Sequence, residues 1–228
     1  GDTDLMPVDW QIELGNYCNS ACIMCSPISS SRLAQEWYEL GFTKNKPVNE
    51  NWVDDPELFD SFVNSLVKIK NLRYLHFIGG ETVITPAFVK ILDRLVQHGL
   101  SDNIILGFTT NLTVYDEKTI AMLKQFKDVH VGLSIETMNT INDYIRWPSK
   151  IDKVKVILDK WVETGKKQGW NISIRPAPNV LSIMYIDQLY DYVMKNKVGI
   201  ETCNFLYKPK YLKINALPID LGKRQSKG

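Results

Sequence analysis

The stretch LRYLHFIGGETVITPAFVKILDRLVQHG, residues 72–99, joins a short apolar run to a longer segment with helical spacing. The run at residues 72–78 has the length and composition of a β-strand. In the longer segment, apolar residues recur three or four positions apart and so share one helix face: Phe88, Ile91, Leu92 and Leu95. Pro86 suits the first turn of such a helix and Gly99 suits its end. We therefore read residues 72–99 as one strand–helix unit.

The same alternation of short apolar runs and longer helical segments continues along the chain in both directions. Six strands are expected, over residues 10–14, 72–78, 103–110, 129–135, 171–178 and 201–207. Helices are expected over residues 56–70, 86–99, 117–125, 151–167 and 186–195. In the first of these helices, the spacing predicts a shared face for Leu58, Phe62, Leu66 and Ile69. Residues 41–56 are rich in turn-forming residues and read as a loop insertion.

Strands that alternate with helices indicate right-handed βαβ units and a parallel sheet. A barrel of eight such units takes about 250 residues. Six units in a chain of 228 residues therefore predict an α/β fold, an open-sided partial (β/α)6 TIM barrel. A doubly wound sheet would use the same elements, and periodicity does not separate the two. We expect one core domain over residues 1–207, and residues 208–228 as a C-terminal tail or the start of a truncated extension.

Composition and charge exclude several classes of protein. The chain is 44% hydrophobic and 23% charged, which is typical of a globular domain with a full core. Its net charge of +1 gives no strong signal for nucleic acid, and no long uncharged apolar run predicts a membrane span. The first ten residues lack the pattern of a signal peptide. A cytoplasmic location is expected, because three of the four cysteines are clustered, unlike a secreted disulfide framework.

The three clustered cysteines lie in NYCNSACIMCSP, residues 16–27, directly after the first expected strand. A parallel barrel places its chemistry in the loops that follow its strands. Thiolates at Cys18, Cys22 and Cys25 can hold a [4Fe-4S] cluster and leave one iron open, because a fully ligated cluster takes four. Structural zinc with Cys203 as fourth ligand is the main alternative, since thiolates bind both. Unliganded core cysteines fit this polar loop less well.

Three further motifs follow the cysteines in order along the chain. They are FIGGET at residues 77–82, TTNL at residues 109–112 and LSIETMNTINDYIR at residues 133–146. With the Cys-x3-Cys-x2-Cys spacing, they make the chain resemble the radical S-adenosylmethionine (SAM) superfamily, whose core is a partial barrel of six βα units. FIGGET is similar to that family's Gly-Gly-Glu motif, and TTNL to its Thr-Asn-Gly turn with Leu112 in place of glycine. The third motif is similar to its Ser-Leu-Asp segment, with Glu136 in place of aspartate.

The resemblance implies a role for each matching residue. Cys18, Cys22 and Cys25 would bind a [4Fe-4S] cluster, and SAM would chelate its open iron. The residues implied in SAM binding are Gly79, Gly80, Glu81, Asn111, Ser134, Arg146, Asn179, Leu181 and Met24. Main-chain atoms of the Gly-Gly-Glu motif would meet the SAM amino group. Ser134 and Arg146 would hold its carboxylate, which suits a planar guanidinium. Main-chain groups at residues 179–181 would meet the adenine, and Met24 would cover the cluster or the adenine edge.

The implied reaction is reductive cleavage of SAM to methionine and a 5'-deoxyadenosyl radical, which removes a hydrogen atom from a substrate. An electron donor such as flavodoxin or ferredoxin is implied as a partner. The substrate stays open among peptide, nucleotide and small metabolite, although relatives with twitch or SPASM extensions modify peptides. Cys203 is expected to be a core cysteine, with a catalytic hydrogen donor or an auxiliary-cluster ligand as alternatives. The alternative function is a zinc- or cluster-stabilised binding module without catalysis.

Several polar residues near strand positions are candidates for the interior of the barrel. They are His76, Glu136, Arg175, Asn204 and Tyr207. A polar residue near a strand end is as often structural as substrate-binding, so the sequence assigns none of them a role.

Overall fold

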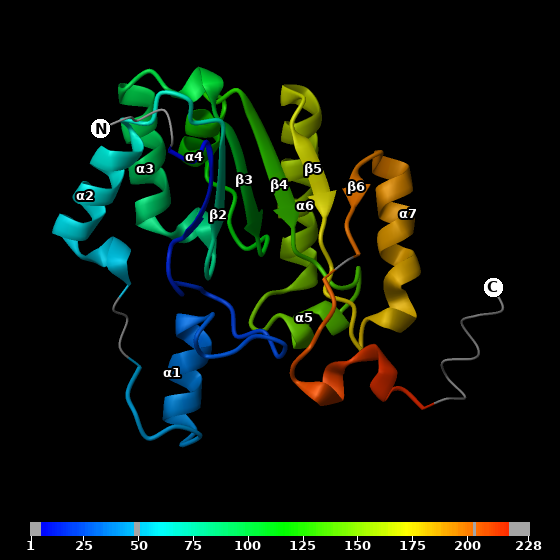
Figure 1. Ribbon diagram of the computed structural model, residues 1–228. Helices are drawn as coiled ribbons and strands as arrows, with labels where there is room; N and C mark the ends of the chain where they lie inside the picture. Colours follow the sequence, from blue (N-terminus) through cyan, green and yellow to red (C-terminus); the bar gives the residue numbers. More distant parts are fainter. Residues whose placement is uncertain (1–5, 48–50, 203, 219–228) are drawn as a thin grey trace.

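The computed structural model describes residues 6–47, 51–202 and 204–218. Within them, six parallel strands form one sheet in the order β1-β2-β3-β4-β5-β6. The strands are β1 Asp9–Glu13, β2 Tyr74–Ile78, β3 Ile105–Thr110, β4 Asp128–Leu133, β5 Asn171–Ile174 and β6 Gly199–Ile200. A doubly wound sheet needs a point at which the strand order reverses. The order here is sequential, which confirms the open, partial barrel (Figure 1).

Seven α-helices connect or follow these strands in the described part of the chain. They are α1 Ser31–Glu39, α2 Pro56–Leu66, α3 Pro86–Gln97, α4 Glu117–Leu123, α5 Ile141–Ile145, α6 Ile151–Gln168 and α7 Ile186–Asn196. Short 3-10 helices are η2 Trp52–Asp54, η3 Thr82–Ile84, η4 Ser101–Asn103, η5 Ile183–Tyr185, η6 Lys210–Leu212 and η7 Ile214–Ala216. In these ranges no helix is both long enough and apolar enough to span a bilayer.

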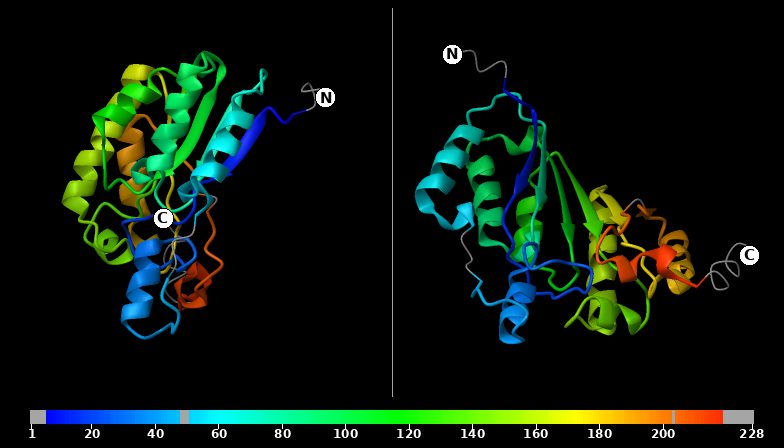
Figure 2. Two further views of the ribbon diagram at one scale, coloured as in Figure 1. Left: turned by 90° about the vertical axis from the view of Figure 1, so that its left-hand side faces the viewer. Right: turned by 60° about the horizontal axis from the view of Figure 1, so that its bottom comes forward.

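The two faces of the sheet differ in polarity. Helices α2, α3, α4, α6 and α7 pack on one face and form the hydrophobic core with it (Figure 2). Strand residues that point to these helices are apolar and buried, among them Leu75, Phe77, Leu106, Phe108, Val129 and Val131. The intervening positions carry polar or small residues, among them Tyr74, His76, Thr109, His130 and Ser173. The sheet therefore has a core face and a polar face, and the polar face is the interior of the open barrel.

One helix faces differently from the sequence-based prediction, and two helices were not predicted. The buried residues of α2 are Phe59, Val63 and Leu66, whereas Leu58 is 55% exposed. The predicted face was wrong at Leu58, but Leu66 and Ile69 are buried and Phe62 packs against the core as predicted. No range was predicted for α1 or α5. The N-terminus of α1 is capped by the Ser30 hydroxyl, which accepts a hydrogen bond from the Leu33 main-chain N–H at 3.2 Å.

The last two strands are shorter than predicted. Strand β5 ends at Ile174, not at residue 178, and Pro176 and Pro178 follow it without N–H groups to continue a ladder. Strand β6 pairs with β5 only at residues 199–200, so the prediction of a strand over residues 201–207 was wrong for the described residues of that range. Because β5 offers no further donors, the chain leaves the sheet after Glu201, whose N–H donates to the Ile174 carbonyl at 2.8 Å.

Residues 204–218 turn back toward the carboxyl ends of the strands, where α1 and α5 also lie (Figure 1). Leu212 in η6 is 4% exposed, and its carbonyl accepts a hydrogen bond from the Val180 N–H at 3.0 Å. Part of the segment expected as a tail therefore packs on the core. Tyr207, a candidate for the barrel interior, is 77% exposed and so does not lie inside.

Candidate functional site

The loop that carries the three cysteines follows β1 and is fixed by hydrogen bonds to the segment after α5. The Ala21 N–H donates to the Trp147 carbonyl at 2.7 Å, and the Ile23 N–H donates to the Ile145 carbonyl at 3.0 Å. Within the loop, the Cys25 N–H donates to the Cys22 carbonyl at 3.0 Å. These main-chain hydrogen bonds tie the cysteine loop to the end of α5 and the turn after it.

The three thiols of this loop differ in burial and in pKa. Cys22 is buried, Cys18 is half-buried and Cys25 is exposed. A hydrogen bond from the Cys22 thiol, aided by the nearby charge of Arg146, lowers the pKa of Cys25 to about 7. The same hydrogen bond and burial raise the pKa of Cys22, and burial raises the pKa of Cys18. Each of the three thiols therefore affects the others: Cys22 interacts with Cys18 and with Cys25, and Cys18 interacts with Cys25.

The chemistry of the three thiols suits an iron–sulfur cluster, because thiolate is the ligand such clusters take. In the described ranges, no group of three or more His, Cys, Asp or Glu side chains is arranged to hold one metal ion. In an iron–sulfur cube, each thiolate binds a different iron, so neighbouring but separate thiols are suitable. Cys203, the fourth ligand of the zinc alternative, lies outside the described residues.

The Gly-Gly-Glu segment packs directly against the start of the cysteine loop. The Gly80 N–H donates to the Gly15 carbonyl at 2.8 Å, and the Glu81 N–H donates to the Tyr17 carbonyl at 2.8 Å. A Cβ atom on Gly80 would lie 2.6 Å from the Tyr17 carbonyl carbon and 2.7 Å from that of Asn16. Gly79 has a φ of +125°, which few other residues adopt. These glycines are therefore required by contact between two main chains, a reason the sequence did not reveal.

Replacing Gly80 by alanine is expected to lower the free energy of unfolding by about 1–3 kcal/mol, because the added methyl group must push two main-chain segments apart. Chemical denaturation of the apo protein measures this change. The control is Gly199→Ala, where the nearest atom to a new Cβ is 3.4 Å away and the cost should be small. Equal stabilities for the two variants would show that the Gly80 contact relaxes freely.

Glu81 and Asn111 join the ends of β2 and β3 to the cysteine loop. The Glu81 carboxylate, 2% exposed, accepts hydrogen bonds from the N–H groups of Asn111 at 2.6 Å and Val83 at 3.4 Å. The Asn111 amide donates to the Asn19 side-chain oxygen at 2.9 Å and to the Ser20 hydroxyl at 3.1 Å. Sequence reasoning noted Asn19 and Ser20 only as polar loop residues, since a contact across about 90 positions leaves no local pattern.

The residue after Asn111 adopts the backbone conformation for which glycine is best suited. Leu112 has a φ of +62° and is fully buried. In the resembling turn this position is glycine, and the positive φ gives the physical reason. Leu112 keeps the turn and adds an apolar side chain to the core.

Burial raises the pKa of Glu81 to about 7, from an ordinary value of 4.5, and its two N–H donors only partly oppose this. The folded state therefore holds a proton that the unfolded state releases between about pH 4.5 and 7. The contribution of protonated Glu81 to the free energy of unfolding is therefore present at low pH. It falls by up to about 3 kcal/mol as the pH rises through that window. The Glu81→Gln variant is expected to show a flatter dependence of unfolding free energy on pH. The exposed Glu163→Gln variant is the control, and an unchanged slope in Glu81→Gln would contradict the assignment.

Arg146 and Glu136 form a buried ion pair beside the thiols. Nη2 and Nε of Arg146 donate to Oε1 of Glu136 at 2.6 and 3.1 Å, and Oε2 of Glu136 accepts from the Ala177 N–H at 2.8 Å. The side chain of Glu136 is 0% exposed and that of Arg146 is 11% exposed. Burial raises the pKa of Glu136, although Arg146 opposes this. These two bonds orient the guanidinium and leave Nη1 of Arg146 for a further acceptor. The SAM carboxylate, which the sequence predicts as a partner of Arg146, is such an acceptor.

Of the other residues predicted to bind SAM, five line one cavity, and Met24 and residues 179–181 do not. A cavity of about 210 Å³ at the strand ends is lined by Gly79, Gly80, Glu81, Asn111 and Ser134, together with parts of β2 and β3. Met24 is half-buried in the cysteine loop. The N–H groups of residues 179–181 all have partners within the protein: Asn179 donates to Ser182, Val180 to Leu212 and Leu181 to Asn179. Main-chain hydrogen bonds to adenine at this turn are therefore limited to carbonyl oxygens.

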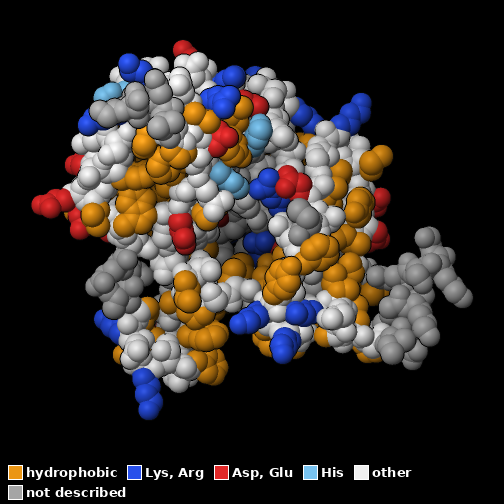
Figure 3. Space-filling model, in the orientation of Figure 1, with side chains coloured by type: hydrophobic (Ala, Val, Ile, Leu, Met, Phe, Trp, Pro, Cys, Tyr) orange, Lys and Arg blue, Asp and Glu red, His pale blue; other side chains and the backbone are white. Residues whose placement is uncertain are grey.

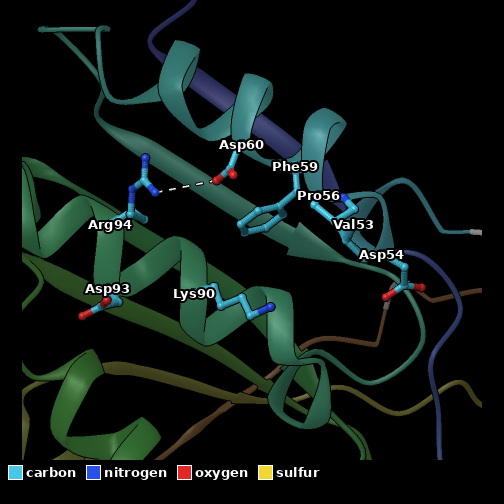
Figure 4. Close-up of a pocket in the computed structure, with 8 residues that line it drawn as sticks. All are labelled: Val53, Asp54, Pro56, Phe59, Asp60, Lys90, Asp93 and Arg94. Atoms are coloured by element: carbon cyan, nitrogen blue, oxygen red, sulfur yellow. Dashed lines mark ion pairs between the residues drawn. The ribbon is translucent and has the colours of Figure 1, made fainter.

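A larger cavity of about 410 Å³ lies between α2 and α3, outside the barrel (Figure 4). It is lined by Val53, Asp54, Pro56, Phe59, Asp60, Lys90, Asp93 and Arg94, and contains the Arg94–Asp60 ion pair at 3.7 Å. None of the residues singled out by the sequence motifs lines it. Five of the motif residues instead line the smaller cavity at the strand ends.

Comparison with known proteins identifies the family. The sequence model of the Radical SAM superfamily matches residues 12–191. This chain belongs to the Radical SAM superfamily. A comparison with curated proteins finds no significant sequence match.

Three solved structures with the same fold illustrate the range of the superfamily. SuiB of Streptococcus suis bound to S-adenosylmethionine is 17% identical, with a TM-score of 0.60, covering 90% of this chain and 40% of SuiB. Native anSMEcpe with bound AdoMet is 20% identical, with a TM-score of 0.62, covering 91% of this chain and 54% of that one. TsrM of Kitasatospora setae, a radical SAM methyltransferase with cobalamin and a [4Fe-4S] cluster, is 11% identical, with a TM-score of 0.58, covering 85% and 36%. These likenesses show the shared fold, and the chain spans about half or less of each of these proteins.

Proposed function

We propose that this chain is the catalytic core of a radical SAM enzyme that cleaves SAM to methionine and a 5'-deoxyadenosyl radical, which removes a hydrogen atom from a substrate. The observation that carries the proposal is the gathering of five motif residues around one cavity next to the cysteine loop: Gly79, Gly80, Glu81, Asn111 and Ser134. They come from three different strand ends and are up to 55 positions apart in sequence. The fold thus unites the motifs that the sequence shows separately.

Each part of the site has a task in this proposal. Cys18, Cys22 and Cys25 hold three irons of a [4Fe-4S] cluster and leave the fourth open to SAM. When bound, the cluster supplies the single electron that breaks the carbon–sulfur bond of SAM. Arg146, held by Glu136, offers its free N–H groups to the SAM carboxylate, with Ser134 as a further donor. The buried Glu81–Asn111 network fixes the loop so that thiols and cavity keep their relative position.

The partners follow from the same proposal. An electron carrier such as flavodoxin or ferredoxin supplies the electron. A peptide is the substrate class that the solved structures support most directly, since SuiB binds precursor peptide SuiA and anSMEcpe binds a peptide. The polar face of the sheet would receive it, with the ion pair between Arg175 and Glu201 at 3.0 Å close to the strand ends.

Anaerobic reconstitution with iron and sulfide tests the proposal. The expected product is a brown protein with about four irons per chain. Under dithionite it is expected to release 5'-deoxyadenosine from SAM. A colourless protein with one zinc and no SAM cleavage would favour the non-catalytic binding module. An iron-loaded protein that never releases 5'-deoxyadenosine would show that the chain keeps the cluster without the chemistry.

A further inference from the structure

A second hollow opens beside the cysteine loop and shares none of its lining residues with the SAM cavity. It measures about 430 Å³, and Cys22 and Cys25 line it. Four exposed aromatic side chains surround it, and we call them the aromatic rim: Trp37, Tyr144, Trp147 and Tyr211, which are 40%, 66%, 48% and 71% exposed. They come from α1, from α5 and the turn after it, and from η6. A group of large aromatic residues left in water around one hollow is typical of an interaction surface.

Different parts of the cysteine loop face this hollow and the SAM cavity. Residues 15–20 contact the walls of the SAM cavity, through hydrogen bonds to Gly80, Glu81 and Asn111. Ala21, Cys22, Ile23 and Cys25 line the hollow, and Cys25 is exposed. A molecule on the aromatic rim would therefore approach Cys22 and Cys25 without entering the cavity assigned to SAM.

The surface beside the aromatic rim is basic. Residues 202–218 contain three lysines, Lys208, Lys210 and Lys213, and no Asp or Glu. Lys208 and Lys210 are exposed, and neither makes an ion pair with another residue that the structure describes. The acidic residues near the hollow are already paired: Glu36 with Arg32 at 3.2 Å and Asp143 with Lys150 at 3.9 Å.

Lysine and arginine side chains stand among hydrophobic ones over the segment that carries η6 and η7 (Figure 3). The Lys150 ammonium lies 5.5 Å from the centre of the Trp147 ring at the edge of the aromatic rim, but its charge is paired with Asp143, so the excess positive charge comes from the lysines at residues 208–213. The whole chain has a net charge of only +1, so this is a local concentration of positive charge.

We propose that the aromatic rim and the adjoining lysines are the docking surface for an acidic one-electron carrier protein. The inference rests on the proposed function, because it assumes a cluster on the cysteine loop. Opposite charge steers a transient redox partner to its site, while a small aromatic patch provides contact without tight binding. We assign a peptide substrate to the polar face of the sheet instead, because the cavity assigned to SAM lies at the ends of those strands.

The test compares two reductants in the reconstituted enzyme. 5'-Deoxyadenosine formation is measured with flavodoxin, kept reduced by its reductase, and separately with dithionite. The Lys208→Glu/Lys210→Glu variant is expected to lower kcat/KM for flavodoxin about tenfold at low salt and to leave the dithionite rate unchanged. The milder Lys208→Gln/Lys210→Gln variant should show a smaller loss. The matched control, Lys118→Glu/Lys167→Glu, changes exposed lysines on α4 and α6 and is expected to behave like the wild type.

The outcomes separate this inference from the proposed function. No dithionite-driven SAM cleavage by the wild type would refute the proposed function itself, and the docking surface with it. Normal cleavage with dithionite, but equal flavodoxin rates in the wild type and both lysine variants, would overturn the docking surface alone. Equal losses with both reductants, or an equal loss in the control, would also overturn it. A wild type that is dimeric, with a monomeric Lys208→Glu/Lys210→Glu variant, would assign the surface to a second copy instead.

Discussion

The Arg146→Met variant is expected to lose about 3–5 kcal/mol of unfolding free energy at pH 7 and above, even without any cofactor. Glu136 is 0% exposed, and Arg146 is the cation that faces its carboxylate at 2.6 Å. Methionine fills much of the same volume but leaves a buried negative charge without a partner. The cost of that charge, and not a lost contact area, sets the size of the effect. Urea denaturation of apo protein measures it.

The pH dependence and a double variant identify the cause. In Arg146→Met, the pKa of Glu136 in the folded state is raised above its unfolded value, so stability falls as the pH rises. The loss relative to wild type should therefore be smaller at pH 5 than at pH 8. Adding Glu136→Gln removes the charge and should restore most of the lost stability. A double variant no more stable than Arg146→Met would mean that packing around the guanidinium, and not the ion pair, is responsible.

The sequence predicted the fold where a periodic pattern coincided with buried packing. Helix α3 has its four predicted face residues fully buried, and its Pro86 and Gly99 mark the helix and its end. Five of the six predicted strands overlap observed strands, and β6 at residues 199–200 precedes the range predicted for it; the six observed strands are parallel in sequential order. The hydrophobic pattern did not predict how short β6 is. That length depends on donors from β5, and Pro176 removes one of them two residues after β5 ends. Such a limit comes from a neighbouring strand and is not encoded in residues 201–207.

The candidate site was predictable as a set of residues but not as a network. The motifs named Gly80, Glu81 and Arg146, yet the partner of each lies elsewhere in the chain. Gly80 contacts Tyr17, Glu81 accepts from Asn111, and Arg146 pairs with Glu136. From the sequence, Gly80 was expected to let SAM approach the main chain. In the structure, the main chain of Asn16 and Tyr17 occupies the space next to Gly80. Contacts between separate loops depend on the assembled sheet, so local spacing does not specify them.

The Cys22→Ala variant is expected to abolish SAM cleavage, with 5'-deoxyadenosine release falling about a thousandfold or more, to background. Cys22 is the buried thiol of the triad and shares a hydrogen bond with Cys25. Its loss leaves only two thiols of the triad, too few to retain an iron–sulfur cube. Iron analysis after reconstitution is expected to fall from about four to less than one iron per chain.

The apo protein distinguishes a lost ligand from a lost fold. Cys22 is 4% exposed, and removing one buried sulfur costs only about 1 kcal/mol, so the unfolding transition of the apo variant should stay near that of the wild type. Cys203→Ala is the matched control, because it also removes one thiol but lies outside the triad. It is expected to keep both iron and cleavage. A Cys22→Ala protein that still released 5'-deoxyadenosine would refute the cluster assignment. A Cys203→Ala protein that lost its metal would revive four-thiolate zinc, because only that site needs every cysteine of the chain.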